Sequence, residues 1–146
     1  MSTDVLTPLV RHLLSLQSAD GGFAARAGIP STTEPTALSL LALASEPDDA
    51  TRPGIVRARA WLVAAQERDG GWPAVAAVPQ STWTTALAVL ALGRDASTRE
   101  PALAGARWLL ALEGRRLPRS NTFKDWLLGR ESTVVVDESL NGWPWV

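Results

Sequence analysis

Apolar residues recur at helical spacing near the start of the chain. Val5, Leu9, Leu13 and Leu16 follow one another at steps of three or four residues, which places side chains on one face of an α-helix. The segment from about 35 to 44 is instead apolar on nearly every side, which is typical of a buried helix. The pattern therefore predicts an amphipathic outer helix followed by a buried inner one.

The same order of elements returns further along the chain. Residues 52–67 have an amphipathic pattern, and residues 83–92 are apolar nearly all round. The connections predicted between outer and inner helices, about 18–33 and 67–82, are longer than most helix–helix loops. We therefore expect two helical hairpins with long internal loops.

The two hairpins are copies of one unit. A shift of 49 residues aligns positions 9–44 with 58–93 without a gap, and 15 of the 36 pairs are identical. Residues 106–113 match the second copy again at a shift of 47, and Gly142-Trp143-Pro144 repeats Gly71-Trp72-Pro73. Such self-similarity is the signature of a repeat architecture.

These matches divide the chain, which we treat as a single domain over 1–146. Repeat 1 is predicted at about 4–45, repeat 2 at about 52–93, and an incomplete repeat 3 at about 98–146, interrupted by an insertion at 114–141. Each hairpin needs neighbours to cover its apolar sides, so about two and a half repeats leave open edges.

A Gln-x-x-Asp-Gly-Gly-aromatic motif ends both outer helices. Glycine takes positive φ without steric cost and stops a helix sharply, and a glutamine amide can bond free carbonyls or the amides of an adjacent helix. The motif residues are Gln17, Asp20, Gly21, Gly22 and Phe23 in the first copy and Gln66, Asp69, Gly70, Gly71 and Trp72 in the second.

On these residues the chain resembles the terpenoid cyclase and protein prenyltransferase superfamily, especially squalene–hopene cyclase-like proteins. The resemblance implies an α/α toroid, in which outer and inner helices alternate around an apolar cavity, and a structural role for the two motifs in tying outer helices together. We therefore predict an all-α fold that forms part of such a toroid.

Composition excludes several kinds of chemistry. The net charge is −1, so the chain has no strong field to attract nucleic acid. Cysteine is absent and His12 is the one histidine, which leaves neither a thiolate site nor a multi-histidine metal site. We expect no metal and no cofactor.

The resemblance also suggests candidate reactive residues. Cyclases of that family which protonate an alkene carry an acidic motif where an inner helix begins, and Glu34 occupies one acidic position of it; a carboxylate there also suits the helix dipole. Trp83 matches Glu34 in the second repeat and is expected at the same cavity mouth, either as packing or as a cation-stabilising ring. Trp143 and Trp145, on the terminal turn, are the other predicted cavity-lining residues. Asp48 and Asp49 are better explained as caps or solvated turn residues.

Two functions stay open. The first is a terpenoid cyclase-like or prenyltransferase-like protein that handles an apolar isoprenoid, with Glu34 starting a cyclisation. The second is a non-catalytic repeat module for protein interaction or assembly, or a piece of a larger toroid enzyme. The expected partners are an apolar small molecule and either a second copy of the chain or a complementary subunit. The acidic N-terminus and the lack of a long apolar run predict a cytoplasmic protein without a transmembrane segment.

Overall fold

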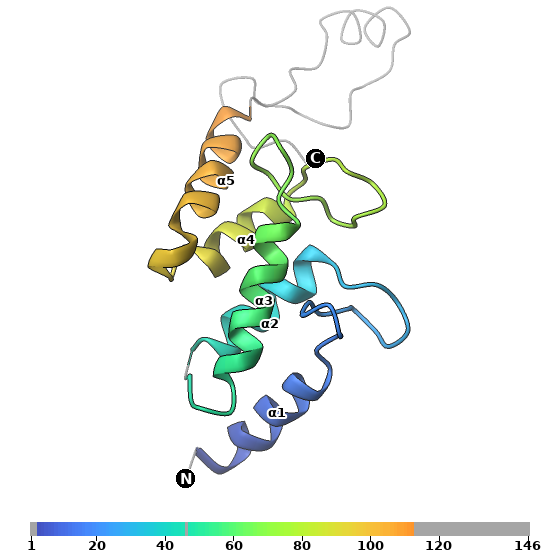
Figure 1. Ribbon diagram of the computed structural model, residues 1–146, viewed down its shortest axis with the longest axis vertical. Helices are drawn as coiled ribbons and strands as arrows, with labels where there is room; N and C mark the ends of the chain where they lie inside the picture. Colours follow the sequence, from blue (N-terminus) through green and yellow to red (C-terminus); the bar gives the residue numbers. More distant parts are fainter. Residues whose placement is uncertain (1–2, 46, 113–146) are drawn as a thin grey trace, which may run out of the picture. The chain divides into compact units, whose positions relative to one another are not determined.

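The computed structural model describes residues 3–45 and 47–112, and this part of the chain is helical and contains no β-strand. The all-α prediction is therefore confirmed. The helices are α1 (Thr3–Ser15), α2 (Thr33–Leu43), α3 (Arg52–Ala64), α4 (Thr84–Leu92), the 3₁₀-helix η1 (Ala96–Thr98) and α5 (Arg99–Ala111) (Figure 1). The predicted insertion at 114–141, Trp143 and Trp145 lie outside the described residues.

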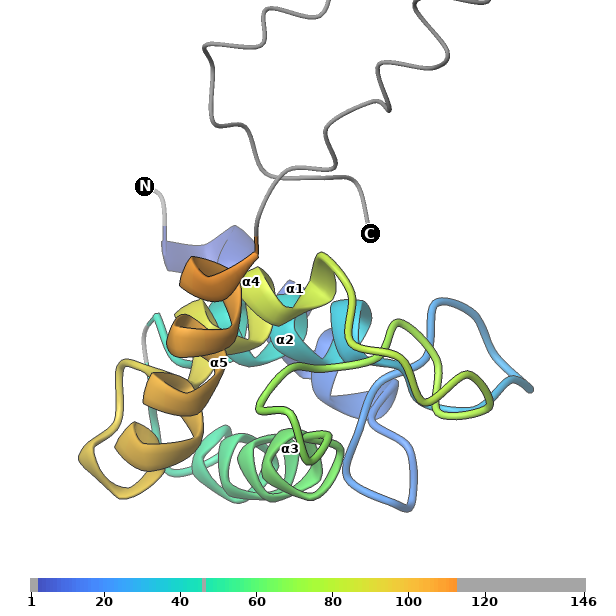
Figure 2. The same ribbon diagram turned by 90° about the horizontal axis from the view of Figure 1, so that it is seen from above.

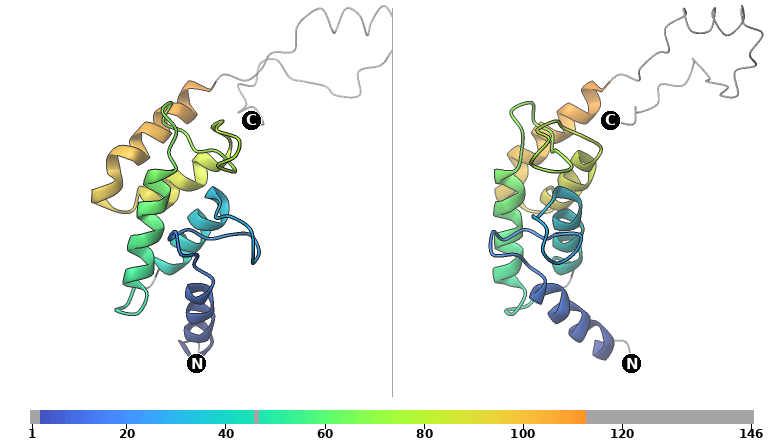
Figure 3. Two further views of the ribbon diagram at one scale, coloured as in Figure 1. Left: turned by 45° about the vertical axis from the view of Figure 1, so that its right-hand side comes forward. Right: turned by 90° about the vertical axis from the view of Figure 1, so that its right-hand side faces the viewer.

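The two apolar helices form the centre of this unit. α2 packs against both α4 and α3. Figures 2 and 3 show α2 and α4 side by side, with α3 covering one side of the pair. Ala37 of α2 and Ala88 of α4 are fully buried, and such small side chains let helices approach closely. The pattern that is apolar all round is thus explained by contacts on several sides.

The core gathers side chains from both predicted hairpins. Its fully buried large residues include Trp72, Leu40, Leu43, Leu62 and Leu92. Burying a leucine or a similar side chain contributes about 1.5–3 kcal/mol. The core therefore depends on the aromatic motif residue as much as on the helices.

The predicted stripe on α1 is wrong in part. Leu9 and Leu16 are 59% and 54% exposed, whereas Val10, Leu13 and Leu14 pack against the core. Apolar residues lie on more than one face of α1. The stripe counted from Val5 follows a face next to the one that packs against the core.

The predicted bounds of two helices also change. α3 ends at Ala64 rather than at 67, because the chain turns into the Gln-x-x-Asp-Gly-Gly segment. α2 begins at Thr33, two residues before Pro35, since proline is tolerated within the first helical turn.

Candidate functional site

The first motif, residues 17–23, links the end of α1 to the start of α3. The Gln17 side-chain amide donates one hydrogen bond to the Gly21 carbonyl (2.8 Å) and one to the Gly54 carbonyl in the first turn of α3 (2.9 Å). Arg57 of α3 in turn donates to the Gln17 side-chain oxygen. The Gln17 side-chain amide thus donates to carbonyl groups of its own turn and of the next outer helix. Of the two kinds of partner that the sequence allowed, carbonyls and amides, it bonds the carbonyls.

Asp20 fixes the shape of this turn. Its Oδ1 accepts from the Gly22 N–H (3.0 Å) and the Ser31 hydroxyl (2.8 Å), and its Oδ2 accepts from the Trp61 indole of α3 (3.0 Å). Burial raises the pKa of the Asp20 carboxyl, but these hydrogen bonds outweigh burial and hold the pKa below its ordinary value. The carboxylate is therefore stabilised in its charged form.

The second motif, residues 66–72, makes the same contacts to α5. Gln66 donates to the Gly70 carbonyl (2.8 Å) and to the Pro101 carbonyl (2.9 Å). Asp69 accepts from the Gly71 N–H, the Ser81 hydroxyl and the Trp108 indole at 2.9, 2.6 and 2.9 Å. As at Asp20, burial raises the pKa of the Asp69 carboxyl, but the hydrogen bonds lower it by more, so the pKa lies below the ordinary value. One set of contacts thus recurs where each outer helix meets the next.

The two glycines of each motif are needed for different reasons. Gly21 and Gly70 have φ of 90° and 93°, a conformation that strains other residues. Gly22 and Gly71 lack positive φ, but a Cβ there would lie 2.6 and 2.4 Å from the Cβ of Ser31 and Ser81. The first glycine permits the turn, and the second permits close packing.

The motif aromatics are held by threonines of the following helices. The Thr36 hydroxyl accepts from the Phe23 N–H (2.9 Å), and the Thr85 hydroxyl accepts from the Trp72 N–H (2.9 Å). Trp72 also donates its indole N–H to the Leu62 carbonyl (2.7 Å). Thr36 and Thr85 are both buried, so their hydroxyls satisfy backbone groups that water cannot reach.

Sequence reasoning missed several of these partners. Ser31 and Ser81 play one role but lie 11 and 12 residues after their aspartates, so the gapless register did not pair them. Trp61 and Trp108 lie 41 and 39 residues from the aspartates they bond. The signal that could have found them is a tryptophan at the same place on consecutive outer helices.

Asp48 acts as a cap, as its turn position suggested. Its Oδ1 accepts from the Thr51 N–H (2.8 Å), and the Thr51 hydroxyl accepts from the Asp48 N–H (2.9 Å). Hydrogen bonding by Thr51, first through its backbone N–H and then through its side chain, lowers the pKa of the Asp48 carboxyl. Asp49 forms an exposed ion pair with Arg52 (3.3 Å). Neither aspartate belongs to a cluster with Glu34.

Glu34 and Trp83 lie where α2 and α4 begin. Glu34 is exposed in the first turn of α2, and Trp83 is the N-cap residue of α4 and is 44% exposed. The preceding Thr33 donates to the Pro73 carbonyl (2.5 Å), and Thr84 donates to the Trp72 carbonyl (3.1 Å). The two helix starts therefore converge on one dipeptide of the second motif loop.

Each of these two residues is followed by an exposed leucine on the same helix. Leu38, one turn after Glu34, is 48% exposed, and Leu90, two turns after Trp83, is 61% exposed. α2 and α4 pack against each other. We call these four exposed positions, Glu34 and Leu38 of α2 with Trp83 and Leu90 at the start and end of α4, the α2–α4 face.

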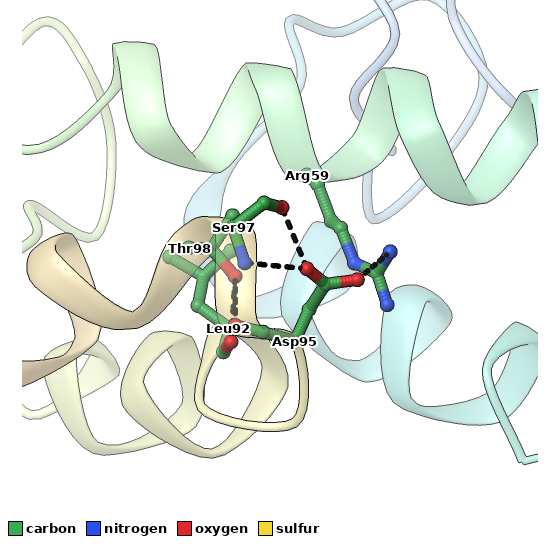
Figure 4. Close-up of polar contacts among 5 residues, drawn as sticks. All are labelled: Arg59, Leu92, Asp95, Ser97 and Thr98. Atoms are coloured by element: carbon green, nitrogen blue, oxygen red, sulfur yellow. Dashed lines mark hydrogen bonds and ion pairs between the residues drawn. The ribbon is translucent and has the colours of Figure 1, made fainter.

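A separate hollow of about 420 Å³ lies between α3 and η1, lined mainly by Val56, Ala60 and Val63 with Ser97 and Thr98. At its edge the Arg59 guanidinium lies 2.6 Å from Asp95 Oδ2 (Figure 4). Asp95 Oδ1 accepts from the Ser97 hydroxyl (2.6 Å) and N–H (2.8 Å). Asp95 therefore links η1, through Ser97, to α3, through Arg59. The hollow shares no residue with the α2–α4 face.

Among residues 3–45 and 47–112, no group of three or more histidine, cysteine, aspartate or glutamate side chains is placed to hold a metal ion. His12, the one histidine of the sequence, is exposed on α1. No helix in this part of the chain has the length and apolar character needed to cross a membrane. In comparisons with known proteins, neither a family model nor a curated protein sequence matches this chain.

Proposed function

We propose that this chain binds an apolar, isoprenoid-type ligand on the α2–α4 face, as a helical repeat protein of the terpenoid cyclase-like kind. The observation that carries the proposal is the exposure of Leu38, Trp83 and Leu90 on the two helices that otherwise form the core. Neighbouring exposed apolar side chains mark surfaces that a ligand or partner covers.

The recurring motif contacts support the same proposal. Gln17 with Asp20, and Gln66 with Asp69, bond the next outer helix in the same way. Repeating this step would keep the inner helices on one side of the array, where their apolar faces join. A partial toroid with a binding surface on the inner helices is consistent with that arrangement.

The proposal covers binding and not proton transfer. An acid that protonates an alkene must be kept in its neutral form, which needs a desolvating site or neighbouring acids. Glu34 is exposed, and no cluster of acids surrounds it among the described residues. We therefore assign Glu34 to the rim of the ligand site.

Calorimetric titration with farnesol tests this function. The double variant Leu38→Asn/Leu90→Asn removes apolar contacts at exposed positions, and we expect it to weaken binding about tenfold, the equivalent of about 1.4 kcal/mol. Leu110→Asn is the matched control, because Leu110 is an exposed leucine on α5. Equal affinity of the double variant and the control would refute the assignment of this face.

One observation favours the second candidate, an interaction module. Helix α1 leaves Leu6 and Leu9 exposed, and Leu16 directly after it is exposed as well. Neighbouring exposed leucines of this kind promote association between copies of the chain. Light scattering of the wild type and of Leu9→Asn tests it. Self-association that Leu9→Asn lowers would support this function, and a wild type that stays monomeric at high concentration would contradict it.

A further inference from the structure

The outer helices α3 and α5 each receive a motif turn at the same positions of the repeat. The aspartate of the turn accepts from the indole N–H of Trp61 in α3 and of Trp108 in α5. The glutamine donates to the carbonyl of Gly54 in α3 and of Pro101 in α5. One face of an outer helix is therefore the receiving face for a motif turn.

Both of these helices bury the apolar part of the receiving face. Ile55 of α3 is 4% exposed, and Ala102, which has the same place in α5, is 6% exposed. Ala58 of α3 and Gly105, its counterpart in α5, are buried as well. A Cβ on Gly105 would lie 2.5 Å from the Trp72 ring, so the aromatic of the turn packs directly on this face.

Helix α1 has the same positions and leaves them exposed. The shift of 49 residues aligns three positions of α1 with the receiving face of α3: Leu6 with Ile55, Leu9 with Ala58 and His12 with Trp61. Leu6 is 50% exposed, and Leu9 and His12 are exposed too. Steps of three residues place them along one side of the helix. We call Leu6, Leu9 and His12 the α1 face.

The α1 face keeps the chemistry that a motif turn requires. An imidazole ring carries an N–H donor in its neutral and in its charged form. His12 can therefore donate to an aspartate, as the indoles of Trp61 and Trp108 do. Leu6 and Leu9 offer apolar surface where the other outer helices are covered, and covering it is favourable.

From this equivalence we infer that the α1 face is a docking site for a Gln-x-x-Asp-Gly-Gly-aromatic turn of a partner polypeptide. Its aspartate accepts from His12, and its aromatic ring covers Leu6 and Leu9. The chain's own turns 17–23 and 66–72 are filled by α3 and α5, so the partner supplies a further turn. The inference rests on the second candidate function, the interaction module, and names the partner of that module.

A synthetic peptide of residues 66–82, with a dye at its N-terminus, is the probe. It contains contacts that close the second turn: the Ser81 hydroxyl bonds Asp69, and the Thr82 N–H bonds the Trp72 carbonyl. Fluorescence anisotropy should show saturable binding to the full chain.

A leucine variant assigns this binding to the α1 face. Leu9→Asn should weaken it about tenfold, because an apolar contact is lost. Leu110→Asn, at an exposed leucine of α5, is the matched control and should leave binding unchanged. Both positions are exposed, so the variants should fold, which circular dichroism verifies.

A double-mutant cycle tests the polar contact. Asp69→Asn in the peptide and His12→Ala in the chain should each weaken binding about fivefold, and the two together should weaken it little further, because both remove one hydrogen bond. His12→Trp should bind at least as tightly as the wild type, since tryptophan holds this position in α3 and α5. Arg11→Ala, at the exposed basic residue before His12, is the control and should bind as the wild type does.

The outcomes separate this inference from the interaction module itself. Equal binding by Leu9→Asn and Leu110→Asn, or fully additive losses in the cycle, would overturn the docking site. Absence of peptide binding by the wild type and by His12→Trp would overturn it as well. Self-association that Leu9→Asn lowers would in that case leave the interaction module standing, with a second copy of the chain as its partner.

Discussion

The two motif turns, residues 17–23 and 66–72, use one backbone design and differ in how each aromatic and glutamine is held. In both, the aspartate accepts hydrogen bonds from a serine that precedes the inner helix and from a tryptophan of the next outer helix. In the first, Arg57 also bonds the Gln17 side chain. In the second, Trp72 bonds the Leu62 carbonyl, and Ala104 occupies the position of Arg57 at the shift of 47.

The difference shows which contacts define the junction and which are optional. The glycine conformation, the aspartate network and the glutamine bonds occur in both copies, so geometry requires them. The Arg57 contact and the Trp72 indole bond each occur once and are alternative ways to strengthen the same connection. Changes to the shared glycine conformation should therefore cost more than changes to the optional contacts.

The largest expected effect is at a shared glycine. In Gly70→Ala, the methyl group meets positive φ and a carbonyl oxygen of Ala104 at 2.9 Å, and we expect a loss of about 3 kcal/mol in the free energy of unfolding. Urea unfolding followed by circular dichroism measures it.

Gly28→Ala is the control for that change. Gly28 also has positive φ, at 82°, but no atom lies within 4 Å of its added Cβ. Gly28→Ala should lower the free energy of unfolding by about 1 kcal/mol, which is the cost of the positive φ alone. Equal losses at both glycines would show that the contact with α5 does not constrain the second turn.

An intermediate effect is expected at the aromatic of the second turn. Trp72→Phe gives this turn the aromatic residue of the first turn. The change removes the bond to the Leu62 carbonyl and leaves space in the core, so we expect the free energy of unfolding to fall by about 2 kcal/mol. Trp83→Phe, at an exposed position, should change unfolding by less than about 0.5 kcal/mol. Urea midpoints compare the two, and a small loss at Trp72 would mean that its ring alone stabilises the turn.

The sequence predicted the parts of this fold that depend on residue type at fixed spacing. Glycine at 21 and 70 and the apolar pattern of α2 and α4 left clear signals, because few residues take positive φ and few helices are apolar all round. The packed face of α1 could not be chosen, since leucines occupy two faces and only tertiary packing, such as the contact of Leu14 with Gly54 of α3, decides between them. The convergence of the Thr33 and Thr84 hydroxyls on the carbonyls of Pro73 and Trp72 depends on tertiary packing and had no local signal.

The smallest expected effect concerns pH and should be equal in the two turns. The pKa values of Asp20 and Asp69 lie below the ordinary value in the folded chain. Their contribution to stability is therefore fully present above the unfolded-state pKa of about 4 and is lost as the pH falls through the lowered folded-state pKa. Unfolding free energies at neutral pH and near pH 3 measure this loss.

Asparagine variants assign that loss to the motif turns. Asp20→Asn and Asp69→Asn should each lower stability at neutral pH and make it less dependent on pH below about 4, because the titrating group is gone. Asp49→Asn, an exposed aspartate outside both turns, should leave the pH dependence as in the wild type. If Asp69→Asn flattened the profile and Asp20→Asn did not, the two carboxylates would not be equivalent, and the bond from Arg57 to Gln17 would be the place to look for the cause, since the second turn has no such bond.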